Sequence, residues 1–339
     1  MDVAIVLLNW NGRSLMERFV PLLIENTPKP TERLNCFVVV ADNASTDGSL
    51  EWLDANFPQI DTIAFDKNYG YAGGYNRALK EIEADYYVLL NSDVEVAPGW
   101  IENLVDFMED NPDVGICQPK LLSLKQRDSF EYAGACGGFV DALGYPFCRG
   151  RIISNIEKDN GQYDKPIECF WATGACLMIR SGLYHHLGGL DPSFFAHMEE
   201  IDLCWRAKLA GHRVWAVPSA VAYHLGGGSL DNASPKKLYL NYRNNLMMLY
   251  KNLPSSRRGR LIFKRMLVDD MAAVFYLISG KWSYFTAVIS AHHDFRHIKG
   301  SLEPSSFSED GNDTGHLRKS IIWLYIKSLG RLTFDKVRF

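Results

Sequence analysis

The sequence of 339 residues lacks several short patterns that identify a class of protein directly. It has seven cysteines, an odd number, and no Cys-x-x-Cys pair. This pattern argues against a disulfide framework or a structural zinc site, and it favours reduced thiols in the core. No Gly-x-Gly-x-x-Gly follows the first apolar run, and the P-loop and Gly-x-Ser-x-Gly patterns are missing. Dinucleotide oxidoreductases, P-loop proteins and α/β-hydrolases are therefore disfavoured.

The chain also has little net charge, because 36 Lys and Arg side chains nearly balance 40 Asp and Glu side chains. This mean hides a difference between two parts of the chain. Residues 1–230 carry 18 basic and 31 acidic side chains, whereas residues 231–339 carry 18 basic and 9 acidic ones. The composition argues against a protein devoted to nucleic acid, and the basic C-terminal part predicts affinity for an anionic surface.

Long uninterrupted hydrophobic runs are scarce as well. The first run, Val3–Leu8, is too short for a signal peptide and has no basic flank, so we interpret it as a buried strand. The longest apolar span, Met271–Ala291, contains Lys281 near its middle, which disfavours a membrane-spanning helix. Two packed helices and helices lying on a membrane both fit this span. A nearby basic cluster fits a contact with anionic lipid headgroups or a solvated face; it comprises Arg257, Arg258, Arg260, Lys264 and Arg265.

What is present is the composition of a globular protein, with 47% hydrophobic and 22% charged residues and a length typical of about two domains. We predict a first domain over residues 1–230 and a basic, mostly helical region over residues 231–339. Within that region, residues 301–315 have the composition of a flexible linker, and Ile321–Leu329 is expected to form a last apolar helix.

Residues 1–120 alternate between strand and helix patterns. The predicted strands are Val3–Leu8, Cys36–Ala41, Thr62–Phe65, Tyr86–Leu90 and Val114–Cys117. A capping box of Ser14 and Glu17 begins the first predicted helix, and the later ones are Ser49–Asn56, Gly73–Ile82 and Pro98 to about Glu109. Strands joined by helices of this length predict an α/β fold with a doubly wound, mostly parallel sheet and helices on both faces.

Short polar side chains follow four of these strands. They lie in the segments Asn9-Trp10-Asn11-Gly12, Asp42-Asn43-Ala44-Ser45, Asp66-Lys67-Asn68 and Asn91-Ser92-Asp93. Each segment alone is ordinary turn chemistry. Because ligands of such sheets bind beyond the carboxyl ends of the strands, the four segments together predict a ligand site at that edge.

Three further features carry candidate chemistry, each with a structural alternative. Asp93 follows an apolar strand, where it can bind a hard divalent cation or cap a turn. Glu199, Glu200 and Asp202 begin a helix, where clustered carboxylates suit general-base catalysis or stabilise the helix N-terminus. His224 precedes three glycines, where it can approach a phosphate or a metal or belong to the core.

The sequence resembles family 2 glycosyltransferases of the GT-A fold in an ordered set of segments: VLLNWNG, VADNASTDGS, KNYGYAGGYNRAL, LLNSDVEV, FF…EEIDLCWR and YHLGGGS. Within that family it is most similar to the rhamnosyltransferase-like and galactofuranosyltransferase-like branch. The resemblance covers about residues 1–230 and continues weakly through Tyr239–Asn252. It implies transfer of a sugar from a nucleoside diphosphate sugar, with inversion at the anomeric carbon.

The resemblance also implies roles for individual residues. Asp42 is expected to hold the base or ribose of the donor, in a nucleotide-sugar site that comprises Leu8, Asn9, Asp42, Asn68, Gly74, Asn76 and Ser92. The metal motif of the family falls on Asn91-Ser92-Asp93, so Asp93 is the implied carboxylate ligand of Mg²⁺ or Mn²⁺, and His224 completes the site.

The branch has a Glu-Asp-x-Asp pattern, which aligns with Glu199-Glu200-Ile201-Asp202 in this sequence. It implies Glu200 as the base that takes the proton of the acceptor hydroxyl, with Asp202 and Glu199 as rivals. Trp171 either stacks on a sugar ring or belongs to the core, and both alternatives stay open at this point.

Two functions follow from this reading. The first is an inverting, metal-dependent glycosyltransferase of cell-surface polysaccharide synthesis, using dTDP-rhamnose and a glycan or lipid-linked acceptor. The second is an inactive nucleotide-sugar-binding homologue or scaffold, because Asn91 and Glu200 depart from the family pattern. A nucleotidyltransferase fits less well, since an early glycine-rich basic loop is missing. We expect a cytoplasmic protein, with a peripheral position on the inner face of the membrane as an open alternative and no nucleic acid partner.

Overall fold

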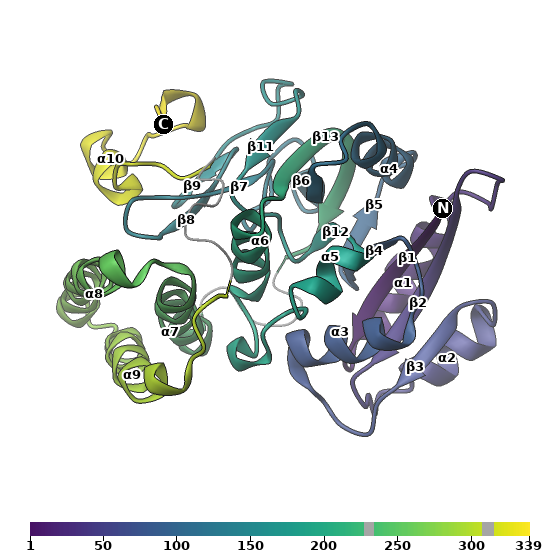
Figure 1. Cartoon of the computed structure of the whole chain (residues 1–339), viewed down its shortest axis with the longest axis horizontal. Helices are drawn as coiled ribbons and strands as arrows, with labels where there is room; N and C mark the ends of the chain where they lie inside the picture. The colour runs from purple at the N-terminus through teal and green to yellow at the C-terminus, as the bar shows by residue number, and fades with distance from the viewer. Residues whose placement is uncertain (227–233, 307–314) are drawn as a thin grey trace.

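The computed structural model describes residues 1–226, 234–306 and 315–339. Within these residues nine strands form one mixed sheet: β1 (Asp2–Asn9), β2 (Asn35–Asp42), β3 (Asp61–Ala64), β4 (Tyr86–Asn91), β5 (Val94–Val96), β6 (Val114–Ser123), β11 (Ile167–Cys169), β12 (Cys176–Arg180) and β13 (Arg213–His224). Their order is β11-β13-β6-β12-β4-β1-β2-β3, with β5 paired to β13 (Figure 1). Because β12 runs antiparallel to both β4 and β6, strands β1, β2, β3, β4, β6 and β13 all point in one direction.

Helices cover both faces of this sheet. On one face, α1 (Arg13–Glu25), α2 (Ser49–Asn56) and α4 (Trp100–Asp110) contribute to a core that includes Ile5. On the other face, α3 (Gly70–Glu81), α5 (Ser181–His186) and α6 (Glu199–Leu209) share a core with Val6. Successive side chains of β1 are therefore buried on opposite faces, as in a central strand. The predicted doubly wound α/β fold is confirmed.

Two helices begin earlier than the sequence predicted. The capping box was wrong: α1 starts at Arg13, has Gly12 at its N-cap and makes no side-chain cap bond. The backbone N–H of Arg13 instead donates to Asp47 Oδ2 at 2.8 Å, and Glu17 pairs with the Arg13 side chain. α3 begins at Gly70, three residues before the predicted start. A distant residue contacts the chain at both starts, because Asn43 Oδ1 accepts the backbone N–H of Tyr69 just before α3 at 3.2 Å.

A small second sheet was not predicted. It has the order β10-β9-β8-β7, and its strands are two or three residues long: β7 (Gly138–Val140), β8 (Pro146–Cys148), β9 (Arg151–Ile152) and β10 (Asn155–Ile156). The end of the chain lies against it, with α10 (Ile321–Lys327) and the short 3₁₀ helix η3 (Phe334–Lys336). The backbone N–H of Ile321 donates to Asp141 Oδ2 at 2.9 Å, and the rings of Phe334 and Phe139 lie 4.8 Å apart.

The C-terminal third contributes three long helices, α7 (Pro235–Asn252), α8 (Ser255–Ile278) and α9 (Trp282–Ile298). Figure 1 shows them side by side next to α6, at the end of the molecule away from β2 and β3. No helix in the described parts of the chain is both long and apolar enough to cross a membrane. Two 3₁₀ turns complete the structure, η1 (Pro192–Phe194) and η2 (Lys299–Ser301). Residues 307–314 of the predicted linker lie outside the described residues.

Candidate active site

Four polar residues that end strands lie along one edge of the large sheet. Asn9 ends β1, Asp42 ends β2, Asn91 ends β4 and His224 ends β13. These strands are parallel to one another, so their carboxyl ends meet at the same edge. β5 pairs antiparallel with the end of β13, which places Asp93 beside His224.

Asp93 and His224 belong to a buried cluster with a third residue, Glu131. His224 Nε2 lies 3.1 Å from Asp93 Oδ1, and His224 Nδ1 lies 3.3 Å from Glu131 Oε1. Burial alone lowers the pKa of His224, but the neighbouring carboxylates of Asp93 and Glu131 outweigh it and raise the pKa to about 10. Each ring nitrogen thus faces one carboxylate.

This cluster presents oxygen and nitrogen donors that suit a divalent cation. Mn²⁺ accepts both carboxylate and imidazole ligands; Asp93 and His224 would supply one of each, with the ion displacing the ring proton of His224. In the described parts of the chain no three His, Cys, Asp or Glu side chains surround a common position. Glu131 has the position of a carboxylate that orients a ligating histidine.

Asn9 and Asp42 are joined where β1 and β2 end. Asn9 Nδ2 donates to Asp42 Oδ1 at 2.8 Å and to Ser45 Oγ at 3.1 Å, and Ser45 N donates to Asp42 Oδ2 at 2.7 Å. Both Asp42 oxygens are thus occupied. Asn9 Oδ1, in contrast, is buried with no hydrogen-bond partner in the described structure. Such an acceptor is suited to a donor group of a bound ligand. Ser92 Oγ faces the same loop, 3.7 Å from where a Cβ of Gly12 would stand.

α3 packs closely beside this edge. Leu8 Cδ1 lies 2.6 Å from where a Cβ of Gly74 would stand, so that the close approach of Leu8 to the helix requires glycine. Asn68 Oδ1 accepts the backbone N–H of the first residue of α3 at 2.8 Å. Asn76 differs from its predicted role near the ribose and diphosphate. Its Oδ1 accepts the backbone N–H of Leu190 at 2.9 Å and its Nδ2 donates to the Leu190 carbonyl at 2.6 Å, which commits this amide to the turn before α6.

Glu199 and Glu200 open α6, and each keeps one buried carboxylate oxygen, Oε2, without a hydrogen-bond partner in the described structure. Burial raises the pKa of Glu200 to about 7, although backbone N–H groups at the helix start pull it down. Burial and the neighbouring Glu200 charge raise the pKa of Glu199 well above its ordinary value. Glu200 therefore changes protonation near neutral pH, which suits a general base, whereas the raised pKa of Glu199 favours its neutral form.

The backbone in front of this acid pair is strained. Phe195, His197 and Met198 have φ angles of 65°, 70° and 76°, a region that residues other than glycine rarely adopt. The buried Asn244 of α7 holds this turn, because its Nδ2 lies 2.9, 2.8 and 2.8 Å from the carbonyl oxygens of residues 194, 196 and 197. A helix of the C-terminal third therefore fixes the direction in which α6 starts.

The side chain of Asp202 points into an ion-pair network and not toward the candidate site. It is fully buried; its Oδ2 accepts Arg206 Nε at 2.7 Å and lies 3.7 Å from Lys251 Nζ. Its Oδ1 accepts Asn252 Nδ2 at 2.7 Å. Both oxygens are thus engaged within the protein. The prediction of Asp202 as a rival base is corrected to a structural role that ties α6 to α7.

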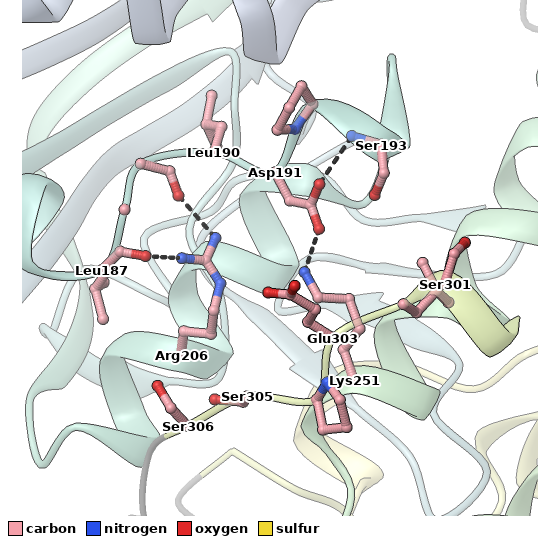
Figure 2. A pocket seen from close by; sticks show the side chains of 15 residues that line it. Leu187, Leu190, Asp191, Ser193, Arg206, Lys251, Ser301, Glu303, Ser305 and Ser306 are labelled. Atoms are coloured by element: carbon pink, nitrogen blue, oxygen red, sulfur yellow. Dashed lines mark hydrogen bonds and ion pairs between the residues drawn. The ribbon is translucent and has the colours of Figure 1, made fainter. Parts of the chain in front are cut away.

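A pocket of about 430 Å³ lies beside this network (Figure 2). Arg206 reaches into it and donates to the carbonyl oxygens of Leu187 and Gly189 at 2.7 and 2.9 Å, and Lys251 contacts the carboxylate of Asp191. Both cations are therefore matched by anions or carbonyls of the protein, and the residues of the predicted catalytic edge do not line this pocket.

The turn at residues 173–175 connects the acid pair with the metal-binding candidates. Glu200 Cβ lies 3.6 Å from where a Cβ of Gly174 would stand, and the backbone N–H of Asn91 donates to the carbonyl of Ala175 at 3.0 Å. Glu200 and Asn91 thus each contact a residue of the segment 173–175.

Trp171, which precedes that turn, belongs to the core. It is 4% exposed, and its Nε1 donates to the carbonyl of Phe139 at 3.0 Å. A Cβ on Gly138 would lie 2.1 Å from the indole, so the ring packs flat against that backbone. The alternative in which Trp171 stacks on a sugar is therefore wrong.

The model of the family described as "Glycosyl transferase family 2" matches residues 4–188, more than half of the chain. The chain belongs to this family. Curated relatives include the N-acetylglucosaminyl-diphospho-decaprenol L-rhamnosyltransferase of Mycobacterium tuberculosis, 26% identical over 253 residues that cover 69% of this chain and 79% of the relative. The low-salt glycan biosynthesis hexosyltransferase Agl10 of Haloferax volcanii is 25% identical over 276 residues, with coverages of 78% and 84%. The rhamnosyltransferase WbbL of Escherichia coli is 23% identical over 216 residues, with coverages of 61% and 79%.

Solved structures support the GT-A fold of this glycosyltransferase. S. aureus TarS 1-349 in complex with UDP-GlcNAc aligns with a TM-score of 0.58 and 17% identity, covering 89% of this chain and 84% of that 1-349 segment. GalNAc-T7 with UDP, GalNAc and Mn²⁺ aligns with a TM-score of 0.59 and 13% identity; the match covers 90% of this chain but only 58% of that longer one. At these identities the likeness concerns the fold alone.

Two residues of the glycosyltransferase site were missed by the sequence prediction. Glu131 lies in a stretch without helix or strand periodicity, and only the folded structure brings it to His224. Asn244 belongs to the segment YRNN, at the weak end of the family resemblance. The signal available in the sequence was two adjacent polar residues, Asn244 and Asn245, beside an apolar run. The structure shows both of them fully buried.

Proposed function

We propose that this family 2 glycosyltransferase moves a sugar from a nucleoside diphosphate sugar to an acceptor hydroxyl with inversion, using Glu200 as the base. The observation that carries the proposal is the Glu200 carboxylate, whose Oε2 is buried without a hydrogen-bond partner in the described structure and whose pKa is about 7. A double displacement would need a second, nucleophilic carboxylate. Glu199 is the neighbouring candidate, and its raised pKa disfavours the ionised form that a nucleophile needs.

In the proposed reaction, Glu200 takes the proton of the acceptor hydroxyl as its oxygen attacks the anomeric carbon. The new bond from acceptor oxygen to carbon forms while the bond from that carbon to the diphosphate oxygen breaks, and the nucleoside diphosphate leaves. One displacement inverts the centre. Asp93 and His224 would hold a Mg²⁺ or Mn²⁺ ion, which offsets the charge on the leaving diphosphate when it is bound. Asn9 Oδ1 would accept a hydrogen bond from the nucleotide.

We further propose dTDP-rhamnose as the donor and a glycan or lipid-linked hydroxyl in cell-surface polysaccharide synthesis as the acceptor, at the cytoplasmic side of the membrane. The proposal is supported by the names of two relatives, which are rhamnosyltransferases, one of them acting on a diphospho-decaprenol-linked sugar. The inactive nucleotide-sugar-binding homologue remains the competing function, and it is motivated by Asn91 and Glu200.

Purified protein mixed with a panel of nucleotide sugars, Mn²⁺ and a lipid-linked or glycan acceptor tests these proposals. We expect release of nucleoside diphosphate with one donor, loss of release with EDTA, and loss with Glu200→Gln. NMR of the product reports the anomeric configuration, so retention would contradict the mechanism. Metal-dependent binding of a nucleotide sugar without turnover would favour the inactive homologue.

A further inference from the structure

α8 carries a row of large apolar side chains on its outward side. Six of them are between 50% and 81% exposed, and they follow one another at intervals of three or four residues, which places them on one side of the helix. We call them the apolar stripe: Phe263, Leu267, Met271, Val274, Phe275 and Ile278; all intervals are three or four residues except that between the adjacent Val274 and Phe275. Contiguous exposed apolar surface of this kind marks an interaction site in soluble proteins.

The opposite side of α8 is fixed to the rest of the protein. Arg265 and Asp269 are buried, form an ion pair at 2.9 Å and face Tyr145, whose hydroxyl donates to Asp269. His292 of α9 lies 3.5 Å from the same carboxylate. A rotation of α8 that buried the stripe would expose or break this ion pair, so the stripe is held outward. In Figure 1, α8 lies at the outer edge of the helical group, beside α7 and α9.

Cations extend the same side of the helix at both ends of the stripe. Arg257, Arg260 and Lys264 are exposed, and their spacing places them in line with Phe263 and Leu267. At the turn into α9, Lys281 is exposed beside Trp282, which is 64% exposed. The acidic side chain at the margin of the stripe, Asp270, lies 3.2 Å from His292 Nδ1. The surface therefore joins apolar side chains to basic ones.

We propose that the apolar stripe and its flanking cations dock this protein on an anionic lipid bilayer, with α8 lying along the surface. Apolar side chains then enter the boundary between headgroups and acyl chains, and the cations face lipid phosphates. Trp282 has the amphipathic ring that this boundary favours. A symmetric contact between two copies through this surface is disfavoured. In one arrangement the cations of one copy would face the cations of the other, and in the other arrangement they would face its apolar stripe. The proposal stands independently of the proposed reaction.

Sedimentation of the full-length protein with lipid vesicles tests this proposal. One set of vesicles is pure phosphatidylcholine, and the other contains phosphatidylglycerol in addition. At low salt we expect binding to the anionic set, at least about tenfold tighter than to the neutral set, and release at high salt. The double variant Phe275→Ser/Ile278→Ser should weaken binding at least about tenfold. Exchange of three cations for Gln should weaken it by about fivefold per charge; the positions are Arg257, Arg260 and Lys264.

Matched controls separate the stripe from general apolar or basic surface. Trp323→Ser/Ile326→Ser removes side chains of α10 that are 60% and 53% exposed, and it should bind vesicles like the wild type. The same holds for Gln at three exposed lysines of the first 230 residues, Lys29, Lys80 and Lys125. All variants should keep the wild-type unfolding temperature and nucleotide binding, measured without vesicles.

Three outcomes would overturn the docking surface. They are absence of binding to anionic vesicles at low salt, equal binding to neutral vesicles, and unchanged binding of the Phe275→Ser/Ile278→Ser variant. Light scattering in solution adds a fourth: a dimer that this variant dissociates would assign the stripe to a second copy. Because nucleotide binding and turnover are measured separately, failure of the reaction proposal leaves these readouts intact.

Discussion

Asn244 Nδ2 lies 2.8 Å from the carbonyl oxygen of His197, so a side chain from the C-terminal third holds the turn in front of the acid pair. His197 has a φ of 70°, and the next residue, Met198, has a φ of 76°. Such a backbone persists only when its surroundings over-determine it. The position of Glu200 therefore depends on α7 as well as on α6.

We expect Asn244→Ala to lower kcat by about tenfold or more while the Kd of the donor changes little. The carbonyl groups of residues 196 and 197 would lose the amide donor that Asn244 supplies, at a cost of about 1–3 kcal/mol each, and the turn would relax toward ordinary φ values. The Glu200 carboxylate would then no longer point toward the acceptor hydroxyl. The carbonyl of residue 194 keeps Arg243 as a donor. Steady-state turnover and calorimetry of donor binding, run on the same preparation, check the two parts.

The matched control for this variant is Asn56→Ala. Asn56 is exposed at the end of α2 and donates one hydrogen bond to the carbonyl one turn back. We expect its turnover and stability to stay close to the wild type. A parallel rise in donor Kd and fall in kcat for Asn244→Ala would contradict a positioning role, because it would indicate general damage to the fold.

The pH dependence of turnover should report Glu200. Its pKa is about 7, and only the deprotonated carboxylate can take the acceptor proton. We therefore expect kcat to rise with pH through about 7 and then to level off. Turnover at saturating donor and acceptor, followed across that range, provides the profile. A kcat that stays constant through pH 7, or that falls as pH rises, would exclude Glu200 as the base.

Glu200→Gln should abolish turnover and stabilise the fold above neutral pH. The folded carboxyl has a pKa of about 7 against an ordinary 4.5, so between these values the folded state binds more protons than the unfolded state. Stability then falls as pH rises, by at most about 3 kcal/mol once pH exceeds 7. Gln removes this penalty, so its Tm should exceed that of the wild type by a few degrees at pH 8. The two Tm values should converge below pH 4.5.

The parallel half of the fold was predictable because each strand there is a continuous apolar run between polar turns. β1 is buried on both faces, and its pattern contains no competing periodicity. The small sheet was not predictable, since strands of two or three residues such as β9 and β10 carry no period to detect. The start of α1 was missed for another reason: the bond between the Arg13 N–H and Asp47 is a tertiary contact.

Some residues of the candidate site were predictable from the sequence and others were not, for the same reason. Asn9, Asp42 and Asp93 follow predicted strands, so the topology of the sheet alone brings them to one edge. Glu131 and Asn244 reach the site only through contacts between segments that the sequence pattern does not relate. Asp202 shows the converse: it lies only two residues after Glu200 in the sequence, but two residues along a helix its side chain points to another side.

Glu131→Gln should weaken Mn²⁺ binding while leaving the fold intact. The charge on Glu131 faces His224 Nδ1 at 3.3 Å, where it orients the imidazole whose other nitrogen faces Asp93. Loss of such an outer carboxylate reduces metal affinity by about 10- to 100-fold. Electron paramagnetic resonance of free Mn²⁺, titrated with protein in the presence of a nucleoside diphosphate, measures the change.

Glu17→Gln is the control for that measurement, because Glu17 is an exposed partner of Arg13 on α1, and its charge does not face His224. It should bind Mn²⁺ like the wild type. If Glu131→Gln bound the ion as tightly as this control, the carboxylate would have no role in orienting His224.

Asp202→Asn should destabilise the protein, in contrast to Glu200→Gln. Removing the charge leaves Arg206 and Lys251 without the carboxylate that both approach in the interior, and breaking a buried ion pair in this way costs about 3–5 kcal/mol. The Tm should fall, and the yield of folded protein should drop. The protein that does fold should still release nucleoside diphosphate, because Glu200 remains. Thermal unfolding and turnover per folded molecule, measured together, check this. Folded Asp202→Asn with wild-type Tm and no turnover would instead make Asp202 the base.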